Sequence, residues 1–303
     1  MLWFFIALTG YFLNAVATLI SKWLLVKDIP EPVVFTFYIG VLNLLAIVLI
    51  PFGVTIPEPI QMLWAIISGI AYAWAMYMLA KALSSDQASQ VAPMVGGLQP
   101  IFVILFALWF LPEVITNSQY LGFALVIIGS ILIALEIGQR KWFSFHKKRL
   151  FTESLKYILY SSALFGLSYA LLKLVYIEQG FVSGFFWTRI GTFIFVIVLA
   201  LIPGNWKLIK NSSNKSGTKA KGWFMIGQII GALSFLLVSY AIAIGPVTVI
   251  NALQGVQYIL LFVLIVIFSK RYKHLLDEPL TKRIIIQKVV SIILIIIGLW
   301  FVV

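Results

Sequence analysis

Apolar runs of about 20 residues recur along the whole chain, and short segments rich in Pro, Gly or charge separate them. A helix of this length crosses the hydrocarbon core of a bilayer. With 62% hydrophobic and 11% charged residues, the chain also has too little polar surface for a soluble domain of 303 residues. We therefore predict an all-α polytopic membrane protein with ten transmembrane helices. The predicted helices cover residues 2–25, 32–52, 60–84, 88–111, 117–138, 153–177, 181–202, 220–243, 247–269 and 284–303.

The ends and loops of these helices carry two further expectations. The first helix lacks a basic amino-terminal region and a small-residue cleavage site, so we expect a retained span rather than a signal peptide. The longest polar segments are residues 138–151 and 205–222. The second is rich in Ser, Asn and Lys, and we expect it to be a flexible loop.

Basic residues gather on one side of the predicted bundle. All of the 22 Lys and Arg residues except Lys173 and Arg189 lie in or near the loops that follow odd-numbered helices. The positive-inside rule makes this side cytoplasmic and places both termini outside. The net charge of +12 then reflects topology and attraction to anionic lipid at the cytoplasmic face. Nucleic-acid binding is not expected, because the charge is divided among separate short loops.

The side chains that most enzyme chemistry needs are scarce. The chain has no Cys, and its two His residues, His146 and His274, lie in basic loops. Neither a metal cluster nor a nucleophile–base pair can be assembled from this inventory. We therefore expect a protein that is not an enzyme and that binds neither a metal nor a cofactor.

The second half of the chain repeats the first in a weak but ordered way. Lys22 aligns with Lys173, Ile39-Gly40 with Ile190-Gly191, Gln99 with Gln257, and Glu113–Thr116 with Glu278–Thr281. Five helices in each half is an odd number, so the halves are expected to have opposite orientations in the membrane. Transporters use such inverted repeats to place one site between two moving halves. We predict a first repeat at 1–138, a basic cytoplasmic linker at 139–152 and a second repeat at 153–303.

These residues resemble the drug/metabolite transporter superfamily, specifically its EamA-type ten-helix members. The family's half-repeat has a Lys late in its first helix, an Arg in its second, a Pro in its fourth, Glu-x-x-Thr before its fifth, and a Gly-rich fifth helix. The matching positions here are Lys22, Pro100, Glu113–Thr116, Gly122 and Gly129 in the first half, and Lys173, Arg189, Glu278–Thr281 and Gly298 in the second. Tyr38 replaces the first Arg, and Tyr258 replaces the second Pro. The resemblance implies a transporter of small metabolites, often an exporter, with a cavity lined by the first, third and fourth helices of each half.

Three amides stand three residues apart in an otherwise apolar helix. Asn251, Gln254 and Gln257 share one face of the helix predicted at 247–269. An amide that pointed into lipid would be unsatisfied, so this face must meet protein or a water-filled cavity. Gln99 holds the equivalent place in the first half. We predict that Gln99, Gln254 and Gln257 bind substrate; the alternative is hydrogen bonding between helices.

Four further polar or aromatic residues lie in the middle of predicted helices. They are Asn14, Tyr72, Tyr169 and Ser234. A lining of aromatic rings and amides suits a substrate with a flat or apolar part and a few polar groups. Packing within the bundle is the alternative for each of the two Tyr residues.

Three basic residues need a separate explanation. Lys22 and Lys173 lie near helix ends, where lysines usually extend toward the interface. Arg189 lies deeper, where a charge must be paired. It could pair with Glu178 or a helix-end carbonyl, or it could bind a carboxylate or phosphate of the substrate.

No predicted helix carries Asp or Glu away from its ends. Exporters of organic cations in the same superfamily use a buried carboxylate in the first helix, where this chain has Asn14. We therefore expect neutral, zwitterionic or anionic cargo, without proton coupling through a buried acid. Glu113 and Glu278 precede predicted helices, and we expect each to stabilise the helix that follows it.

Together these observations predict a transporter of a small metabolite, such as an amino acid or related compound, by alternating access. Export or exchange is expected, across the cytoplasmic (inner) membrane of a bacterium. A flippase or transporter of a lipid or lipid-linked precursor is the alternative. The expected partners are the small-molecule substrate and the lipid bilayer, and the protein is expected to be a monomer or homodimer.

Overall fold

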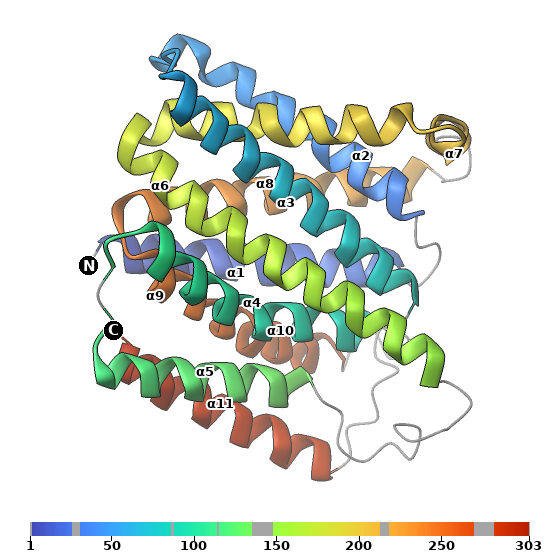
Figure 1. Ribbon diagram of the computed structural model, residues 1–303. Helices are drawn as coiled ribbons and strands as arrows, with labels where there is room; N and C mark the ends of the chain where they lie inside the picture. The colour runs from blue at the N-terminus through green and yellow to red at the C-terminus, as the bar shows by residue number, and fades with distance from the viewer. Residues whose placement is uncertain are drawn as a thin grey trace.

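A computed structural model describes residues 2–25, 31–85, 88–113, 115–134, 148–212, 218–269 and 282–302. Every regular element within these residues is a helix, as the sequence predicts, and most of the helices run along a common direction (Figure 1). The two chain ends lie at the same end of the bundle. The helices are α1 (Leu2–Leu25), α2 (Pro32–Leu42), the 3₁₀ helix η1 (Asn43–Phe52), α3 (Pro59–Ser85), α4 (Ala88–Phe110), α5 (Asn117–Ala134), α6 (Lys148–Leu201), α7 (Asn205–Ser212), α8 (Thr218–Ile244), α9 (Val247–Ala252), α10 (Gln254–Ser269) and α11 (Lys282–Val302).

The described helices are long and apolar enough for a polytopic membrane protein. By length and composition, seven of them could cross a bilayer. One of the seven, Glu153–Leu201, is 49 residues long. Met94–Phe110 and Asn117–Leu132 are apolar but shorter. The count of ten spans stays a prediction.

Helix α6 is broken at Gly180, where φ is +72° and ψ is +172°. This backbone conformation is open to Gly at no steric cost because it has no Cβ. The chain turns back there, so that the last part of α6 runs alongside other helices of the bundle (Figure 1). The break separates the helices predicted at 153–177 and 181–202.

Two other predicted elements differ in the structure. The helix predicted at 247–269 is divided at Leu253 into α9 and α10. Part of the loop predicted to be flexible at 205–222 forms the short helix α7. This expectation was wrong because composition ignores packing: Ile209 of α7 is buried against Val33 and Val34 of α2.

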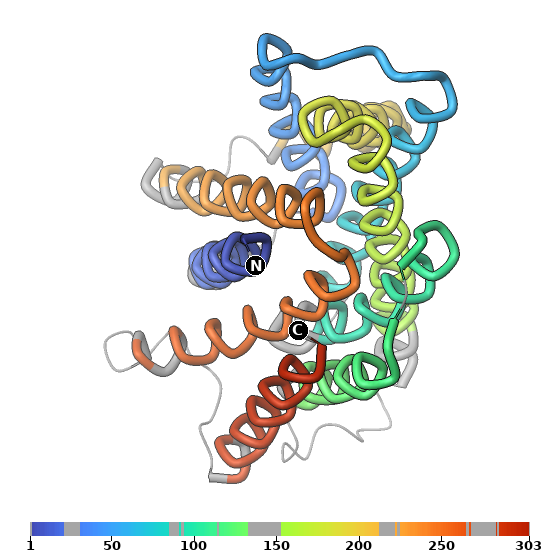
Figure 2. Tube along the Cα trace, turned by 90° about the vertical axis from the view of Figure 1, so that its left-hand side faces the viewer, coloured from blue at the N-terminus to red at the C-terminus, as the bar shows by residue number. Residues whose placement is uncertain are grey.

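Helices from the two halves of the chain pack together in corresponding pairs. Helix α3 packs on α6 and α1 on α8; α4 packs on α6 and α1 on α10; α5 packs on α11. Figure 2 shows α1 between α8 and α10, with α5 beside α11 at one edge. If the first half of the chain is exchanged for the second, the pair α3–α6 corresponds to α1–α8, and the pair α4–α6 corresponds to α1–α10.

Small residues and reciprocal hydrogen bonds hold α3 against α6. The Ser68 hydroxyl donates to the Ser168 carbonyl, and the Ser168 hydroxyl donates to the Ser68 carbonyl, each at 2.9 Å. Further along, a Cβ on Gly69 would lie 2.9 Å from the Cα of Gly191. Without a hydrophobic driving force between helices in lipid, such close packing is a main source of association.

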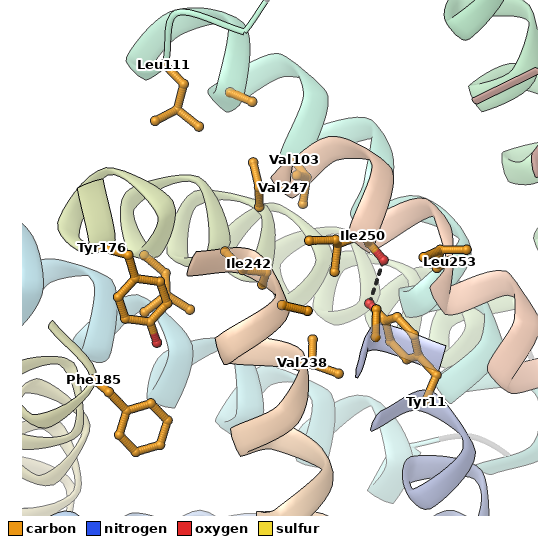
Figure 3. Packing of buried hydrophobic residues seen from close by; sticks show 14 of the residues in the cluster. Tyr11, Val103, Leu111, Tyr176, Phe185, Val238, Ile242, Val247, Ile250 and Leu253 are labelled. Carbon is orange, nitrogen blue, oxygen red and sulfur yellow. Dashed lines mark hydrogen bonds between the residues drawn. The ribbon is translucent and has the colours of Figure 1, made fainter. Parts of the chain in front are cut away.

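The largest buried cluster joins α1, α4, α6, α8 and α9 (Figure 3). Its members include Tyr11, Val103, Val238, Ile242, Val247, Ile250 and Leu253. The Tyr11 hydroxyl donates to the Ile250 carbonyl at 2.9 Å, which satisfies a polar group at the centre of this cluster. The core therefore lies across the two halves of the chain rather than within either one.

Glu113 stabilises α9 rather than the helix that follows it. Its two carboxylate oxygens accept from the Val247 amide at 3.0 Å and from the Thr248 hydroxyl at 2.9 Å. These groups form the first turn of α9, where unpaired amides and the helix dipole favour a negative charge. Glu113 thus has a structural role, as expected, but it stabilises α9 instead of the helix that follows it in the chain. The corresponding expectation for Glu278 lies outside the described residues.

Lys173 stabilises the other side of the turn between α8 and α9. Its ammonium donates to the carbonyls of Ile242 and Ala243, at 3.0 and 3.2 Å. These carbonyls belong to the last turn of α8, where a positive charge is favoured. Half-buried Lys173 therefore ties α6 to the end of α8 instead of extending away from the protein.

We expect Gly191→Ala to destabilise the fold by about 1–3 kcal/mol, because overpacking separates well-packed elements. The added Cβ would overlap the Ile66 carbonyl oxygen and lie 2.9 Å from the Ile66 Cα. Thermal unfolding of the detergent-purified protein measures the effect. Gly231→Ala is the control, since its Cβ would meet only the Ala17 Cβ, at 3.8 Å. Equal losses in both variants would contradict the role given to this crossing.

We expect Glu113→Ala to lower the free energy of unfolding by about 1–2 kcal/mol, because α9 loses its N-terminal partner. The same thermal unfolding assay applies. Glu58→Ala removes an exposed carboxylate and serves as the control. A melting temperature unchanged by Glu113→Ala would show that this cap does not stabilise α9.

Candidate functional site

Two pairs of amides join the first half of the chain to the second. Gln99 of α4 donates from Nε2 to Asn251 Oδ1 of α9 at 2.9 Å. Asn14 of α1 donates from Nδ2 to Gln257 Oε1 of α10 at 3.0 Å. Gln99, Asn251 and Gln257 are buried and Asn14 is half-buried. We refer to these two contacts as the amide pairs.

The amide pairs show which helices contact the predicted polar face of Asn251, Gln254 and Gln257 in this conformation. Because the helix is divided at Leu253, Asn251 and Gln257 lie on different helices and meet α4 and α1 respectively. Gln99 and Gln257 each form a hydrogen bond with an Asn. Hydrogen bonds between membrane helices average about 0.6 kcal/mol, so each pair is weak enough to exchange its partner.

Gln254 lies beside the amide pairs with an incomplete set of partners. Its Nε2 is 3.5 Å from the Tyr258 hydroxyl, and its buried Oε1 has no hydrogen-bond partner among the described residues. The Tyr258 hydroxyl packs directly on Gly96 of α4, where a Cβ would overlap it. The substitution of Tyr for the family's Pro at position 258 therefore fills the space that Gly96 leaves.

Ser234 ties α8 to α1. Its hydroxyl donates to the Gly10 carbonyl at 2.8 Å and is fully buried. In this conformation Ser234 is a contact between helices. The next residue, Phe235, belongs to a second group of side chains.

That second group surrounds Arg189, which is 3% exposed. The guanidinium carbon lies 4.4 Å from the ring centre of Phe235, 5.0 Å from Phe185 and 5.1 Å from Tyr72. Nη1 donates to Asn43 Oδ1 at 3.1 Å. Buried Nε has no acceptor among the described residues. We name Arg189, Asn43, Tyr72, Phe185 and Phe235 the Arg189 cage.

The Arg189 cage surrounds a buried charge that has no counter-charge among the described residues. A charge at the centre of a membrane helix costs about 2.5–3.5 kcal/mol on insertion scales. A cation–π contact returns about 0.5–2 kcal/mol and uses no N–H donor. Within the described residues, the ion pair of the structure is Lys156–Glu153 on the surface, so neither Glu178 nor another carboxylate neutralises Arg189.

Tyr169 lies at the border of the Arg189 cage. It stacks on Phe165 with ring centres 6.4 Å apart, and Phe165 in turn meets Tyr72 edge-on at 5.6 Å. Tyr72 also meets Phe235 at 5.1 Å. Tyr72 and Tyr169 thus belong to one aromatic cluster.

The structure divides the predicted site residues into three sets. Asn14, Gln99, Gln254 and Gln257 gather around the amide pairs, and Tyr72, Tyr169 and Arg189 gather at the Arg189 cage. Lys173 and Ser234 instead bind carbonyls of neighbouring helices. The side chain of Lys22 lies outside the described part of the chain.

Sequence analysis missed Asn43, Phe185 and Phe235. Asn43 carried a usable signal, because it is an amide in the apolar segment 32–52, the same signal that identified Asn14. The two Phe residues carried none, since the chain has 24 Phe and their role depends on which one faces the guanidinium. Among the described residues, no three His, Cys, Asp or Glu side chains gather as a metal site would require.

Three comparisons place the chain among known proteins. Residues 1–135 match the EamA-like transporter family. Protein LicB of Haemophilus influenzae is 45% identical over 49 residues, which are 16% of this chain and 17% of that protein, so the chain spans under a fifth of that relative's length. A protein of known crystal structure is similar in fold, with a TM-score of 0.68 over 98% of this chain and 94% of its own. At 14% identity, this likeness concerns the fold alone.

The family match covers the part of the chain that carries Lys22, Pro100, Glu113–Thr116, Gly122 and Gly129. It agrees with a bundle of apolar helices long enough to span a membrane. The match of residues 1–135 to the EamA-like transporter family therefore supports membership of the drug/metabolite transporter superfamily.

Proposed function

We propose that this protein carries a small neutral, zwitterionic or anionic metabolite, such as an amino acid or a related compound, across the bacterial cytoplasmic membrane. Residues 1–135 match a family of membrane transporters, and the helices make the protein an integral multi-pass membrane protein. Export or exchange by alternating access is the proposed mode.

The observation that carries this proposal is the sign of the charge inside the bundle. Away from helix ends the predicted spans contain no Asp or Glu, whereas Arg189 is buried among them. The amide pairs at the junction of the halves are neutral. A cation would meet an unfavourable field there, while a neutral or anionic group would not.

Reciprocal packing supports movement of one half against the other. The pairs α3–α6 and α1–α8 correspond under exchange of the halves, as do α4–α6 and α1–α10. This is the arrangement that an inverted repeat would give, with a site on the axis between its units. The amide pairs lie on that junction, so a substrate that replaces one amide would loosen one contact between the halves.

The helices that line this junction also contain departures from regular geometry. Helix α2 changes to a 3₁₀ helix at Asn43, and α9 is separated from α10 at Leu253. Such interruptions in membrane helices are the usual positions of bending in transporters. We infer that these two points bend as the halves rock.

The test is transport into proteoliposomes containing the purified protein. Radiolabelled amino acids, small carboxylates, amines, nucleobases and sugar phosphates are supplied in turn, and uptake or exchange is counted. We expect saturable flux of at least one neutral, zwitterionic or anionic solute and none of the quaternary amines. Flux confined to amines, or to labelled lipid, would overturn the proposal. Absence of any flux where a matched control transporter is active would do the same.

We expect Gln257→Ala to reduce transport about fivefold or more, because the amide of Asn14 loses its partner and the substrate loses a hydrogen-bonding group. Initial rates in proteoliposomes give the measurement. Gln119→Ala is the matched control, since Gln119 also bonds across helices, from Nε2 to the Val302 carbonyl at 3.2 Å, but outside the amide pairs. Equal losses in both variants would assign Gln257 a purely structural role.

A further inference from the structure

We propose that Arg189 binds the carboxylate of the transported substrate, and that Asn43 occupies this position while the site is empty. The proposal rests on the proposed function and names the substrate class: a small amphiphilic or zwitterionic carboxylate. Nothing in the family match or in the similar proteins assigns a role to either residue.

The first step of the argument is the charge. Arg stays protonated at any physiological pH, so its buried guanidinium is a permanent cation. The contacts of its guanidinium within the described residues include three aromatic rings and one neutral amide, and no ion pair joins it to a carboxylate there. A permanent buried cation that has no resident carboxylate is an incomplete site, and an anion is what would complete it.

The second step is the direction of the unused hydrogen bonds. Rings pack within 4.4 to 5.1 Å of the guanidinium carbon and engage its π-face or flank, but they accept no conventional hydrogen bond. A guanidinium has five N–H donors in its plane. Nη1 reaches Asn43 Oδ1, while Nε is buried without an acceptor among the described residues. A planar carboxylate accepts two parallel N–H bonds from one edge of the guanidinium, either Nη1 with Nη2 or Nε with Nη2, which a single amide oxygen does not.

The third step is the position of the Arg189 cage. Arg189 lies about 13 Å of helical rise beyond the break at Gly180, close to half of the roughly 30 Å hydrocarbon core. Asn43 and Tyr72 come from the first half of the chain, and Phe185 and Phe235 from the second. The cage therefore lies about halfway along the apolar part of α6 that follows Gly180 and at the junction of the halves, where alternating access requires the substrate to bind.

The fourth step links binding to movement. Asn43 is the residue at which α2 becomes the ten-residue 3₁₀ helix η1, and its Nδ2 donates to the Ile39 carbonyl at 3.0 Å. Runs of 3₁₀ helix beyond a few residues are uncommon and often mark a hinge. A substrate carboxylate that displaces Asn43 Oδ1 from Arg189 removes a hydrogen bond between η1 and α6. Substrate binding would then alter the hinge directly.

An uncharged residue at position 43 is essential to this scheme. Asn gives the guanidinium one acceptor but no counter-charge, so a carboxylate from solution can replace it. Asp at the same place would form a permanent ion pair with Arg189 and exclude the substrate. If Arg189 were only a structural cation, the same Asp would raise the melting temperature of the protein without affecting carboxylate binding.

The deciding experiment compares Asn43→Asp, Asn43→Ala and Arg189→Gln with the unmodified protein. Binding is measured by thermal shift of the detergent-purified protein with amino acids, each tested beside its amide, such as leucine and leucinamide. We expect the unmodified protein to be stabilised by at least one amino acid and about tenfold more weakly by its amide, because the amide lacks the charge. Asn43→Asp should raise the melting temperature and weaken carboxylate binding at least about tenfold, whereas Asn43→Ala should bind at least as well as the unmodified protein.

Arg189→Gln separates a binding role from a folding role. We expect it to bind the amino acid and its amide with similar, weak affinity, since both then meet a neutral side chain. Unaltered carboxylate binding in Asn43→Asp, or equal dependence of both ligands on Arg189, would overturn the proposal. Carboxylate binding without flux in proteoliposomes would contradict the transport function while supporting the Arg189 site. Flux of uncharged solutes alone would contradict this site and support transport.

Discussion

A bilayer offers no water to a buried polar group, and this constraint accounts for most of the contacts described above. A hydroxyl or amide side chain inside the bundle has to find a partner on its own helix or on another one. Tyr11 finds the Ile250 carbonyl, Ser234 finds the Gly10 carbonyl, and Ser68 and Ser168 satisfy each other. Because these partners come from opposite halves of the chain, satisfying them also assembles the halves.

The same constraint makes the weakly satisfied groups informative. A hydrogen bond between two neutral amides costs little free energy to replace, which suits the proposed exchange of the amide pairs with a substrate. Arg189 is the stronger case, because its charge is held by rings and one amide rather than by a carboxylate. A structure optimised only for stability would pair such a charge or replace it with an apolar side chain.

In contrast to Arg189, the charged residues at the turn between α8 and α9 have protein groups as partners. Glu113 and Lys173 come from different parts of the chain and hold the start of α9 and the end of α8. Their partners are backbone groups that every helix end leaves unpaired. Both residues are therefore explained by the architecture, whereas Arg189 is not.

The sequence by itself determined the all-helical membrane class and the positions of most helices, because length and apolar periodicity reflect the thickness of the bilayer. It also identified the amides and Arg189 as groups that cannot face lipid. Only the tertiary structure decided their partners: Gln99 with Asn251, Asn14 with Gln257, and Glu113 with α9 instead of the helix after it. Hydrogen bonds between residues so far apart in the chain depend on how helices cross, and a local pattern carries no record of those crossings.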